Sequence, residues 1–483
     1  MKLRELLCGI EALEVRGEIE VEVSSVEEDS RRVRPGALFV ARRGTRTDGH
    51  RYIGEAVRRG AVAVVREDPP DPALTVPQIR VPESGEALGL LLSALYRHPE
   101  RDLTLIGITG TNGKSSVTWM VHRALRRAGR IAGLVGTLLY DTGRRREKAR
   151  ETTPPPVRLY ELLSEMREHG AEAAVLEVSS HALDQRRVAG LAFFAAVFTN
   201  LSRDHLDYHR DLESYYAAKR RLFTHHLRED GVAVVNVRCP WGRRLAGEIP
   251  PGRRIIRVGE DFRIEAVSRR REGLLVRILD PAGVFEVRTA LFGDFQAENL
   301  LSAWAVLRGL GFSPEELVEH LSGVSAPAGR LEPVAEFRGA RVFVDYAHTP
   351  EALTAALRSL RHLTSGRLVC VFGCGGNRDR GKRPEMGRVA SRLADLVFVT
   401  SDNPRFEDPE AIVRDILSGM NGGAPRRVVL ERREALREAL RSLGPGDVLL
   451  VAGKGHEDYQ EVRGRRIPFS DAEEIRRLVH ELS

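Results

Sequence analysis

One arrangement of hydrophobic and polar positions recurs along this chain. A short run of β-branched and other apolar residues is followed by a cluster of Gly, Ser, Thr, Asn or Asp, and then by a segment with helical periodicity. Continuous apolar strands that alternate with helices are typical of parallel sheets with helices on both faces. We therefore predict an α/β fold with ligand sites at the carboxyl ends of its strands, where the polar clusters fall. The instances are residues 103–116, 173–183, 195–207, 367–379, 395–405 and 447–457.

Changes in composition along the chain predict three domains, and 483 residues are enough for roughly that number. Short strands such as "VEVSSV" and "ALFVA" mark the first part, which ends at "YRHPERD", and the stretch "SGVSAPAGRLEP" reads as a linker. We expect an N-terminal α/β domain over 1–98, a central domain with a parallel sheet over 99–328, and a C-terminal Rossmann-like α/β domain over 329–483.

Composition narrows the class of protein. Hydrophobic residues make up 42% and charged residues 30% of the chain, and no apolar run approaches the ~18 residues that span a bilayer. The N-terminal stretch "MKLRELLCGIEALEV" interrupts its apolar patch with glutamates, which does not fit a secretory signal. The four cysteines are scattered, as in a protein with reduced thiols rather than a disulfide framework or zinc site. We therefore expect a cytoplasmic protein without a membrane span.

The net charge of +7, with 75 Lys and Arg residues, favours anionic ligands. By itself this charge fits nucleic acid and phosphorylated small molecules equally well. A nucleic-acid-binding ATPase would need basic and aromatic residues along a groove, and only 6% of the residues are aromatic. We therefore expect no nucleic-acid partner. If DNA or RNA alone stimulated ATP hydrolysis, that result would favour a nucleic-acid-binding ATPase instead.

The stretch "ITGTNGKSS" (108–116) carries the strongest local signal for ligand binding. It follows a predicted strand and opens a segment whose apolar residues fall on one helical face. A Gly-rich turn at a helix N-terminus presents backbone N–H groups to phosphate, Lys114 adds a positive charge, and Ser115 is placed to hold Mg²⁺. The spacing departs from the common phosphate-loop pattern, because only two residues separate Gly110 from Gly113. The stretch nevertheless predicts nucleotide binding.

Polar clusters also follow the next two predicted strands. Glu177 ends the strand in "LEVSSHALDQRR" (176–187), where a carboxylate can hold Mg²⁺ beside the phosphate loop, although the following serines fit a helix N-cap as well. The stretch "TNLSRDHLDYH" (199–209) places His205 among several charged side chains, and such a cluster is costly after a buried strand unless it is paired or binds a ligand.

Two further stretches carry no clear functional signal by themselves. In "YYAAKRRLF" (215–223) the periodicity alone predicts an ordinary surface helix, with Lys219 as a solvated charge. The tetrapeptide Asp402-Asn403-Pro404-Arg405 reads as a turn after a strand, because the residue before proline is pushed towards extended geometry.

Taken in order, the motifs of this chain resemble those of the Mur ligases, in particular the type that extends UDP-N-acetylmuramoyl-L-alanyl-D-glutamate. The resemblance covers almost the whole chain in the family's order, which a single phosphate loop could not provide. The motifs are "DSRRVRPGALFVA" (29–41), "GTRTDGH" (44–50), "TGTNGKSS", "TTP" (152–154), "EVSSHAL", "NLSRDHLDYH", "AAKRRLF", "FGDFQAENLLSAWA", "GRLE" (329–332), "VDYAHTP" (344–350), "GCGGNRDRGKRP" (373–384), "SDNPR" and "AGKGHEDYQ" (452–460).

The resemblance implies an ATP-dependent, ADP-forming amide synthesis in peptidoglycan precursor assembly, and so a role in cell-wall biogenesis, cell shape and division. The family transfers the γ-phosphoryl group of ATP to the D-Glu side-chain carboxylate, and an amine then attacks the acyl phosphate through a tetrahedral intermediate. A carboxylate is a poor electrophile at neutral pH, and phosphorylation supplies a leaving group. Catalysis is then mostly positioning and charge neutralisation.

The resemblance also implies a role for individual residues. Lys219 matches the lysine that the family carbamylates, which turns a cation into an anion able to bind Mg²⁺. The implied catalytic residues are Lys114, Glu177, His205 and Lys219, and the implied Mg²⁺ ligands are Ser115, Glu177, His205 and the Lys219 carbamate. ATP would contact Gly110, Thr111, Asn112, Gly113, Lys114, Ser115, Ser116, Asn299, Arg330 and Asp345.

The remaining implied sites bind the precursor and the amino acid. The UDP-precursor would contact Ser30, Thr45, Arg46, Thr47, Thr152, Thr153, Ser179, Gln185 and Arg187, and the amino acid Arg378, Asp402, Asn403, Pro404, Arg405, Gly453 and Glu457. Local departures from the family are Ser115-Ser116 where many relatives have two threonines, and Glu151 before the Thr pair where some have Asn.

In the family, Asp-Asn-Pro-Arg accompanies meso-diaminopimelate. An arginine fork can bind the distal carboxylate that distinguishes this substrate from lysine. We therefore expect meso-diaminopimelate as the amino acid and a monomeric enzyme, with L-lysine or LL-diaminopimelate as alternative substrates. Folylpolyglutamate synthase and the D-alanyl-D-alanine-adding Mur ligase are less favoured, because the first lacks the "DSR…PGALFVA" domain and the second would leave Arg405 and Glu457 without a partner.

Overall fold

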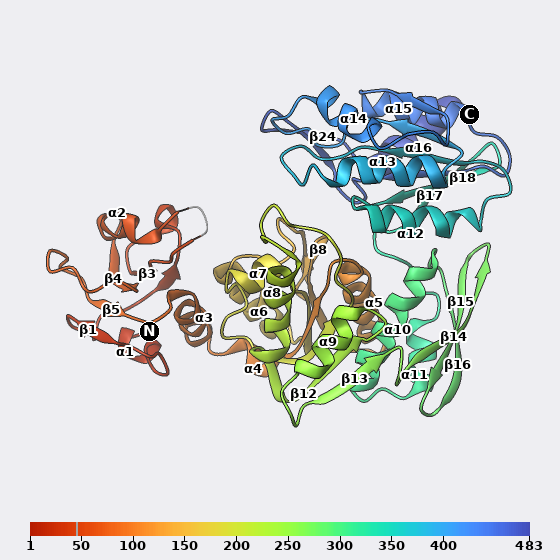
Figure 1. Ribbon diagram of the computed structural model, residues 1–483. Coiled ribbons are helices and arrows are strands. Elements are labelled where there is room, and N and C mark those ends of the chain that lie inside the picture. Colours follow the sequence, from red (N-terminus) through yellow and green to blue (C-terminus); the bar gives the residue numbers. More distant parts are fainter. Residues whose placement is uncertain (45–46) are drawn as a thin grey trace.

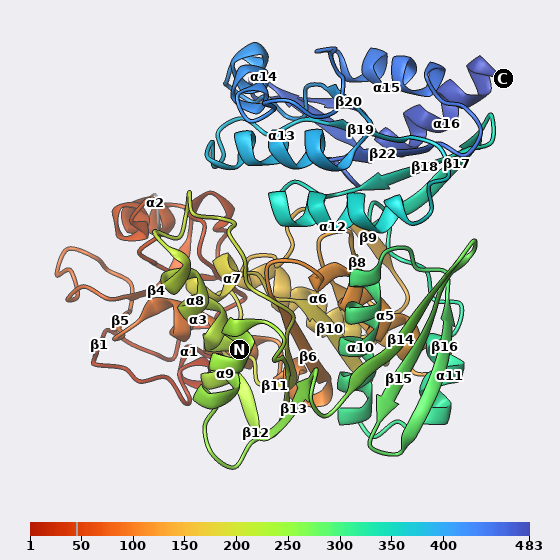
Figure 2. The ribbon, with the colours of Figure 1, turned by 45° about the vertical axis from the view of Figure 1, so that its right-hand side comes forward.

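The computed structural model of the protein describes residues 1–44 and 47–483, and the strands of these residues form five sheets. The chain runs from an N-terminal part through a central part to a C-terminal part, which is coloured blue in Figure 1. In both Figure 1 and Figure 2 the C-terminal part lies over the central part and the N-terminal part lies to one side. Helices alternate with largely parallel strands, so the predicted α/β fold class is confirmed.

The N-terminal part contains a five-stranded sheet with the order β1-β5-β4-β3-β2. Its strands pair in parallel except for β1, which is antiparallel to β5. The strands are β1 (Glu14–Arg16), β2 (Ser25–Glu27), β3 (Ala37–Val40), β4 (Ala61–Arg66) and β5 (Gln78–Arg80), and the helices are α1 (Leu3–Leu6), α2 (Ile53–Arg58) and α3 (Ser84–Leu95), with 3₁₀ turns η1 (Ser30–Arg32) and η2 (Gly49–Tyr52). The short helix α4 (Pro99–Asp102) begins the central part and packs against its elements α6 and β6.

The central part is built on an eight-stranded sheet with the order β13-β12-β11-β6-β10-β7-β8-β9, parallel from β13 to β7. The strands are β6 (Thr104–Thr109), β7 (Ala132–Val135), β8 (Leu139–Asp141), β9 (Arg146–Lys148), β10 (Ala173–Glu177), β11 (Phe193–Phe198), β12 (Leu227–Asn236) and β13 (Arg254–Val258). The helices are α5 (Lys114–Arg127), α6 (Pro156–Glu168), α7 (Ser180–Asp184), α8 (Leu212–Thr224), α9 (Pro240–Glu248), α10 (Asp294–Gly309) and α11 (Pro314–Leu321). An antiparallel sheet of β14 (Arg263–Arg270), β15 (Gly273–Asp280) and β16 (Gly283–Thr289) packs beside α10.

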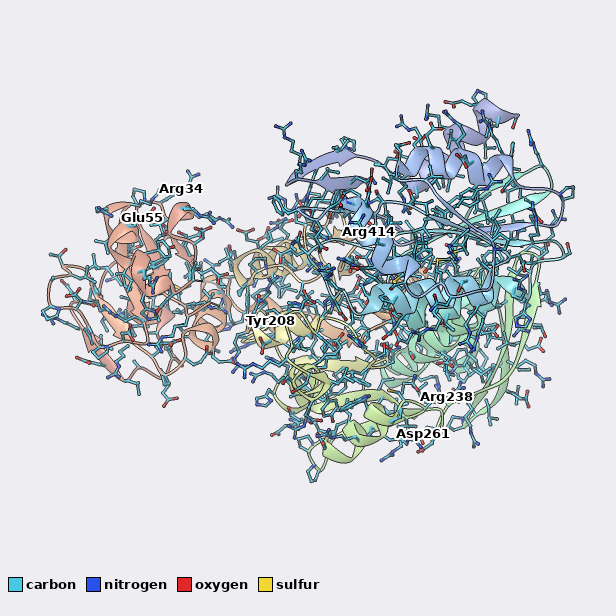
Figure 3. The ribbon with its side chains drawn as sticks, turned by 45° about the horizontal axis from the view of Figure 1, so that its top comes forward. Arg34, Glu55, Tyr208, Arg238, Asp261 and Arg414 are labelled. Carbon is cyan, nitrogen blue, oxygen red and sulfur yellow. The ribbon has the colours of Figure 1, made fainter. Side chains whose placement is uncertain are left out.

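The C-terminal part has a six-stranded sheet with the order β17-β18-β22-β19-β20-β21, parallel except for the β17–β18 hairpin. Its strands are β17 (Glu332–Phe337), β18 (Ala340–Asp345), β19 (Leu368–Phe372), β20 (Leu396–Val399), β21 (Arg426–Val428) and β22 (Val448–Ala452), followed by the hairpin β23 (Tyr459–Val462) and β24 (Arg465–Pro468). Its helices are α12 (Pro350–Arg361), α13 (Lys382–Leu393), α14 (Pro409–Leu417), α15 (Arg432–Arg441) and α16 (Asp471–Leu482). Figure 3 labels Arg414 on α14 of this part and Glu55 on α2 of the N-terminal part.

All six predicted strand–cluster units form parallel strands, which lie side by side in two groups. The strands β11, β6 and β10 are neighbours in the central sheet, and β22, β19 and β20 are neighbours in the C-terminal sheet. Parallel neighbours end at the same edge of a sheet, so the polar clusters that follow them gather there. We propose that the three large sheets mark three domains with the boundaries expected above.

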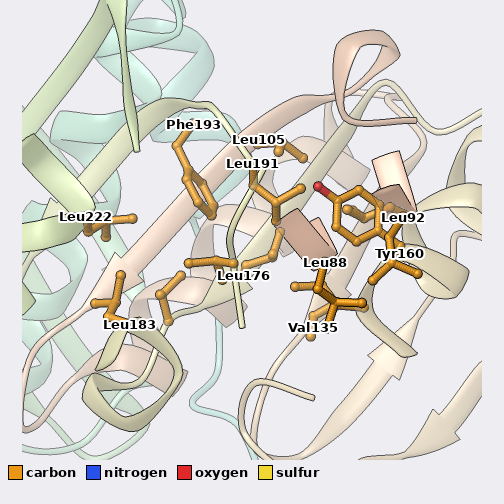
Figure 4. Packing of buried hydrophobic residues seen from close by; sticks show 14 of the residues in the cluster. Leu88, Leu92, Leu105, Val135, Tyr160, Leu176, Leu183, Leu191, Phe193 and Leu222 are labelled. Atoms are coloured by element: carbon orange, nitrogen blue, oxygen red, sulfur yellow. The ribbon is translucent and has the colours of Figure 1, made fainter. Parts of the chain in front are cut away.

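A continuous hydrophobic core joins the N-terminal and central parts. Leu88 and Leu92 on α3 belong to the same buried cluster as Leu105 and Phe193 of the central sheet, as Figure 4 shows. The two parts approach closely at Gly89, where an added Cβ would lie 2.3 Å from the Ala189 carbonyl oxygen. Each fully buried leucine contributes about 1.5–3 kcal/mol, so these two parts are held together by apolar packing. No helix of residues 1–44 and 47–483 has the length and apolar character needed to cross a bilayer.

Candidate active site

The phosphate loop lies between β6 and α5, where the sequence predicts it. Gly110 has a φ of 146°, and a Cβ there would lie 1.9 Å from Thr199 Oγ1. Gly113 has a φ of 87°, and a Cβ there would lie 2.4 Å from Asn299 Oδ1. Both positions therefore require glycine, because other residues rarely adopt these φ angles and because a side chain there would clash with its neighbour. Lys114 curls back over the loop, its Nζ donating to the Gly110 carbonyl oxygen at 2.9 Å.

Lys219, on α8, is fully buried, so the expectation of a solvated surface charge is wrong. Its Nζ donates to the Gly110 carbonyl oxygen at 2.8 Å, the same oxygen that accepts from Lys114. Burial, and then the positive charge of Lys114, hold the pKa of Lys219 well below its usual range. The side chain therefore favours a neutral amine beside the phosphate loop.

Glu177, at the end of β10, lies next to the phosphate loop and is 2% exposed. Ser115 Oγ donates to Glu177 Oε2 at 2.9 Å, and Arg330 from the C-terminal side donates to the same hydroxyl at 3.1 Å. Thr137 holds the carboxylate from the other side, its backbone N–H donating to Oε1 at 2.9 Å and its hydroxyl to Oε2 at 3.0 Å. The hydroxyl and carboxylate oxygens thus meet at one point at the N-terminus of α5.

His205 follows β11 in a left-handed conformation with a φ of 54°. Its ring lies 4.9 Å from that of His181 and its Nε2 lies 3.5 Å from Asp204 Oδ2. In residues 1–44 and 47–483, no three His, Cys, Asp or Glu side chains are grouped closely enough to hold a metal. The donor chemistry still fits Mg²⁺, because Ser115 and Glu177 supply oxygen atoms at one point and a carbamate on Lys219 would supply more.

A cavity of about 290 Å³ adjoins the phosphate loop and is lined by Asn112, Gly113, Ser115, Ser116, Asn299, Arg330 and Asp345. The Asp345 carboxylate accepts from the backbone N–H groups of Leu331 at 2.7 Å and Ala347 at 2.8 Å. Burial raises the pKa of Asp345 to about 6. The Arg330 guanidinium lies 4.7 Å from the ring centre of Tyr346, so a cation–π pair forms part of the cavity wall.

A second cavity, of about 1770 Å³, is lined by residues from all three parts of the chain. Arg32 comes from the N-terminal part, Thr152 and His205 from the central part, and Arg405 and Glu457 from the C-terminal part. One continuous space therefore connects the central sheet with the "SDNPR" and "GKGHE" loops.

The residues expected to bind the precursor lie in two places. Thr153, Ser179, Gln185 and Arg187 form one connected group: the Ser179 N–H donates to Thr153 Oγ1 at 3.1 Å, and Arg187 donates to the Thr153 carbonyl at 2.7 Å and to Gln185 Oε1 at 2.9 Å. Ser30 is in the N-terminal part, where its hydroxyl donates to Glu55 at 3.2 Å. Thr152 lines the large cavity, Thr47 is exposed, and Thr45 and Arg46 fall outside the residues that the structure describes.

All residues expected to bind the amino acid, apart from the buried Pro404, line the large cavity. Asn403 donates to Glu457 Oε2 at 2.7 Å, which places the two side chains together on the cavity wall. Arg405 has a φ of 53°, held by hydrogen bonds between its backbone and β23, and its Nη1 donates to the Gly376 carbonyl at 2.7 Å. Arg378 lies 3.5 Å from Asp207 of the central part.

Ion pairs join the central and C-terminal parts across the large cavity. Arg203 lies 3.2 Å from Asp379, in addition to the Arg378–Asp207 pair, and Lys148 on β9 pairs with Asp458. These charges are partly exposed, so each pair contributes little by itself. The two arginine pairs lie on the loops that carry His205 and Arg378, and the Lys148–Asp458 pair joins β9 to the residue before β23, so the three pairs link the two walls of the cavity.

Sequence reasoning missed several residues of the site. Thr137, Tyr346 and Lys454 contact the expected residues, but no residue type or spacing in the sequence marked them as site residues. The glycines around Lys454 in "AGKGHE" were the one available signal, since two glycines close to a lysine after a strand mark a tight approach.

Comparison with known proteins gives full-length matches. The chain matches the family models "Mur ligase family, catalytic domain" over residues 22–96, "Mur ligase middle domain" over 108–307 and "Mur ligase, glutamate ligase domain" over 329–455. It is 42% identical to the UDP-N-acetylmuramoyl-L-alanyl-D-glutamate--2,6-diaminopimelate ligase of Geobacter metallireducens, over 100% of this chain and 99% of the relative, and 43% identical to that of Gloeobacter violaceus, over 99% and 97%. A solved structure of a ligase with the same name is similar with a TM-score of 0.71 and 31% identity, over 100% of this chain and 99% of the other.

Proposed function

Because the chain belongs to the Mur ligase family, we propose that it is an ATP-dependent, ADP-forming ligase of peptidoglycan synthesis. Its reaction joins meso-2,6-diaminopimelate to the D-Glu side-chain carboxylate of UDP-N-acetylmuramoyl-L-alanyl-D-glutamate. The enzyme acts as a monomer in the cytoplasm. The observation that carries this proposal is the single cavity into which Thr152, His205, Arg405 and Glu457 all face, beside the phosphate loop.

The phosphate loop and its neighbours bind ATP in this proposal. The backbone N–H groups at the start of α5 and the Lys114 amine face the phosphates, and the smaller cavity with Asn299, Arg330 and Asp345 takes the adenosine. In the structure Arg330 donates to Ser115 Oγ and so reaches towards the phosphate site from the C-terminal part. Its guanidinium can neutralise charge there when the cavity closes.

Ser115, Glu177, His205 and a carbamate on Lys219 would hold Mg²⁺. A bound Mg²⁺ would neutralise the charge of the transferred phosphoryl group. The burial of Lys219 supports the carbamate, because a neutral amine attacks CO₂, forms the N–C bond and releases one proton. The product is an anion, and it lies at a place where burial and the charge of Lys114 disfavour a second cation.

The precursor lies between the N-terminal part and the group formed by Thr153, Ser179, Gln185 and Arg187, with its D-Glu carboxylate towards the phosphate loop. The "SDNPR" and "GKGHE" loops take the amino acid. Arg405 and Arg378 donate hydrogen bonds to the carboxylate that distinguishes diaminopimelate from lysine, and Glu457 accepts a hydrogen bond from an ammonium group. Binding of the carboxylate by Arg378 replaces its present ion pair with Asp207.

Phosphate release tests the proposal. The purified protein is incubated with ATP, Mg²⁺ and UDP-N-acetylmuramoyl-L-alanyl-D-glutamate against meso-diaminopimelate, LL-diaminopimelate, L-lysine and D-alanyl-D-alanine. We expect release that requires both the precursor and meso-diaminopimelate. Activity with L-lysine alone would overturn the amino acid and leave the reaction class standing, and ATP hydrolysis stimulated by DNA or RNA without the precursor would overturn the reaction class.

A further inference from the structure

Behind the wall of the amino-acid pocket lies a lysine, Lys454, which the proposed reaction leaves without a role. It follows β22 between Gly453 and Gly455, both of which have positive φ angles, of 110° and 53°. A Cβ on Gly453 would lie 2.7 Å from Asp402 Oδ2, and one on Gly455 would lie 2.7 Å from Tyr346 Cβ. The two glycines thus let the chain turn tightly enough to direct the lysine inward.

The Lys454 side chain is fully buried and ends among polar groups of the pocket. Its Nζ donates to Asn403 Oδ1 at 3.2 Å and to Glu457 Oε2 at 3.1 Å, and lies 3.9 Å from Asp402 Oδ1. Asp402, Asn403 and Glu457 line the large cavity, whereas Lys454 does not. A buried cation is costly unless its charge and its hydrogens are satisfied, so these three partners explain its presence.

These contacts determine how Asn403 and Glu457 face the cavity. The Asn403 amide oxygen accepts from Lys454 and, at 2.9 Å, from the backbone N–H of Glu461, so its NH₂ group must point to Glu457 Oε2, at 2.7 Å. Glu457 Oε2 then has two donors. Among residues 1–44 and 47–483 no donor reaches Glu457 Oε1, which leaves that oxygen for an incoming ammonium.

The charge of Lys454 also sets the charge of the cluster that it forms with Asp402 and Glu457 on the cavity wall. Asp402 and Glu457 are two carboxylates near one another, and one buried cation between them leaves a net charge of about −1. This balance suits the binding of one ammonium group. Without the lysine, two carboxylates would repel each other across the pocket and the Asn403 amide would lose one of the two partners that orient it.

We propose that Lys454 is a positioning residue for amino-acid recognition, which holds Asn403 and Glu457 so that Glu457 Oε1 accepts a hydrogen bond from an ammonium group of the substrate. The proposal rests on the proposed function for the identity of that amino acid. Lys454 contacts neither the nucleotide cavity nor the phosphate loop, so its effect should be confined to the amino-acid substrate.

The test compares steady-state kinetics of Lys454→Met, Lys454→Gln and Lys454→Arg with wild type in the phosphate-release assay. Because a hydrogen bond to a charged group is involved, we expect Lys454→Met to raise the KM for diaminopimelate about 10- to 100-fold, with the KM for ATP and for the precursor within about twofold of wild type. Lys454→Gln should act in the same direction and serves if the methionine variant does not fold. Lys454→Arg keeps the cation and should raise KM less than the other two.

The matched control is Lys2→Met, which removes an exposed lysine from its 2.8 Å pair with Glu20 in the N-terminal part and should leave all three KM values unchanged. A KM for diaminopimelate within about threefold of wild type in Lys454→Met or Lys454→Gln would overturn the inference. So would a parallel rise of all three KM values, which indicates a merely structural role. Failure of wild type to use any amino acid would instead overturn the proposed function, and use of L-lysine alone would transfer the same test to the KM for L-lysine.

Discussion

Replacing Arg405 by glycine should separate recognition of the amino acid from stability of the fold. The φ of 53° costs an L-residue about 1 kcal/mol, which glycine does not incur. The side chain donates to the Gly376 carbonyl at 2.7 Å and lies 3.3 Å from Glu461. Losing these partly exposed contacts costs about 1–2 kcal/mol, so the relief of strain offsets most of the loss. We therefore expect a Tm within about 4 °C of wild type.

The expected effect of Arg405→Gly on activity is much larger, because the guanidinium is the proposed partner of a carboxylate. Two hydrogen bonds to a charged group contribute about 1.5 kcal/mol or more each, and the sum of about 3 kcal/mol corresponds to a loss of more than about a hundredfold in kcat/KM. Phosphate release against diaminopimelate concentration measures it. The KM for ATP is the internal control, because Arg405 does not line the nucleotide cavity.

A matched variant, Glu461→Gln, removes the charge that faces Arg405 and keeps the guanidinium. We expect its kcat/KM for diaminopimelate to fall by no more than about tenfold, because only the orientation of Arg405 is loosened. If folded Arg405→Gly retained kcat/KM for diaminopimelate within about threefold of wild type, the carboxylate-binding role would be refuted.

Three further predictions follow from buried charges. Arg432 and Asp471 form a fully buried ion pair with two hydrogen bonds of 2.7 Å, so Arg432→Met should lower the free energy of unfolding by about 3–5 kcal/mol, which scanning calorimetry would record as a Tm loss of roughly 10 °C. The double variant Arg432→Met/Asp471→Leu should recover most of this stability, because it leaves no unpaired buried charge. A loss of no more than about 1 kcal/mol in Arg432→Met would contradict the prediction. NMR of the protein in ¹³C-bicarbonate should show a carbamate resonance in wild type and none in Lys219→Ala, and the activity of that variant should fall more than about a hundredfold. An unchanged carbamate resonance in Lys219→Ala would exclude Lys219 as its source. The folded-state pKa of Asp345 is raised to about 6, so the protonated carboxyl stabilises the fold fully below about pH 4, and this contribution is lost as the pH rises through about 6. Relative to Asp345→Asn, the wild-type free energy of unfolding should therefore fall by about 2–3 kcal/mol between pH 4 and pH 8. A difference in thermal stability between the two proteins that does not change with pH would contradict the burial effect.

Local features of the fold could be predicted because they depend on neighbours in sequence. The apolar runs 103–116 and 173–183 became the adjacent strands β6 and β10, since unbroken apolar strands need cover on both faces. The phosphate loop could be predicted for the same reason: glycines, a lysine and a helix start within nine residues define it.

The burial of Lys219 could not be predicted from periodicity, because the partner that buries it, Gly110, is 109 residues away along the chain. The left-handed conformation of Arg405 was likewise hidden, since it depends on pairing with β23. Only the family resemblance pointed to Lys219, and nothing in the sequence pointed to Thr137 as a partner of Glu177.

The sequence by itself determined the α/β class, the places where polar clusters end strands, and the glycine-rich turn into a helix at 108–116. Tertiary structure alone decided that Lys219 is buried with its pKa held well below the usual range, that Lys454 lies behind the wall of the large cavity, and that residues of three parts face that one cavity. The physical reason is that charge state, burial and orientation depend on groups brought together by packing, and the sequence pattern reports only the preferences of each segment for its own local structure.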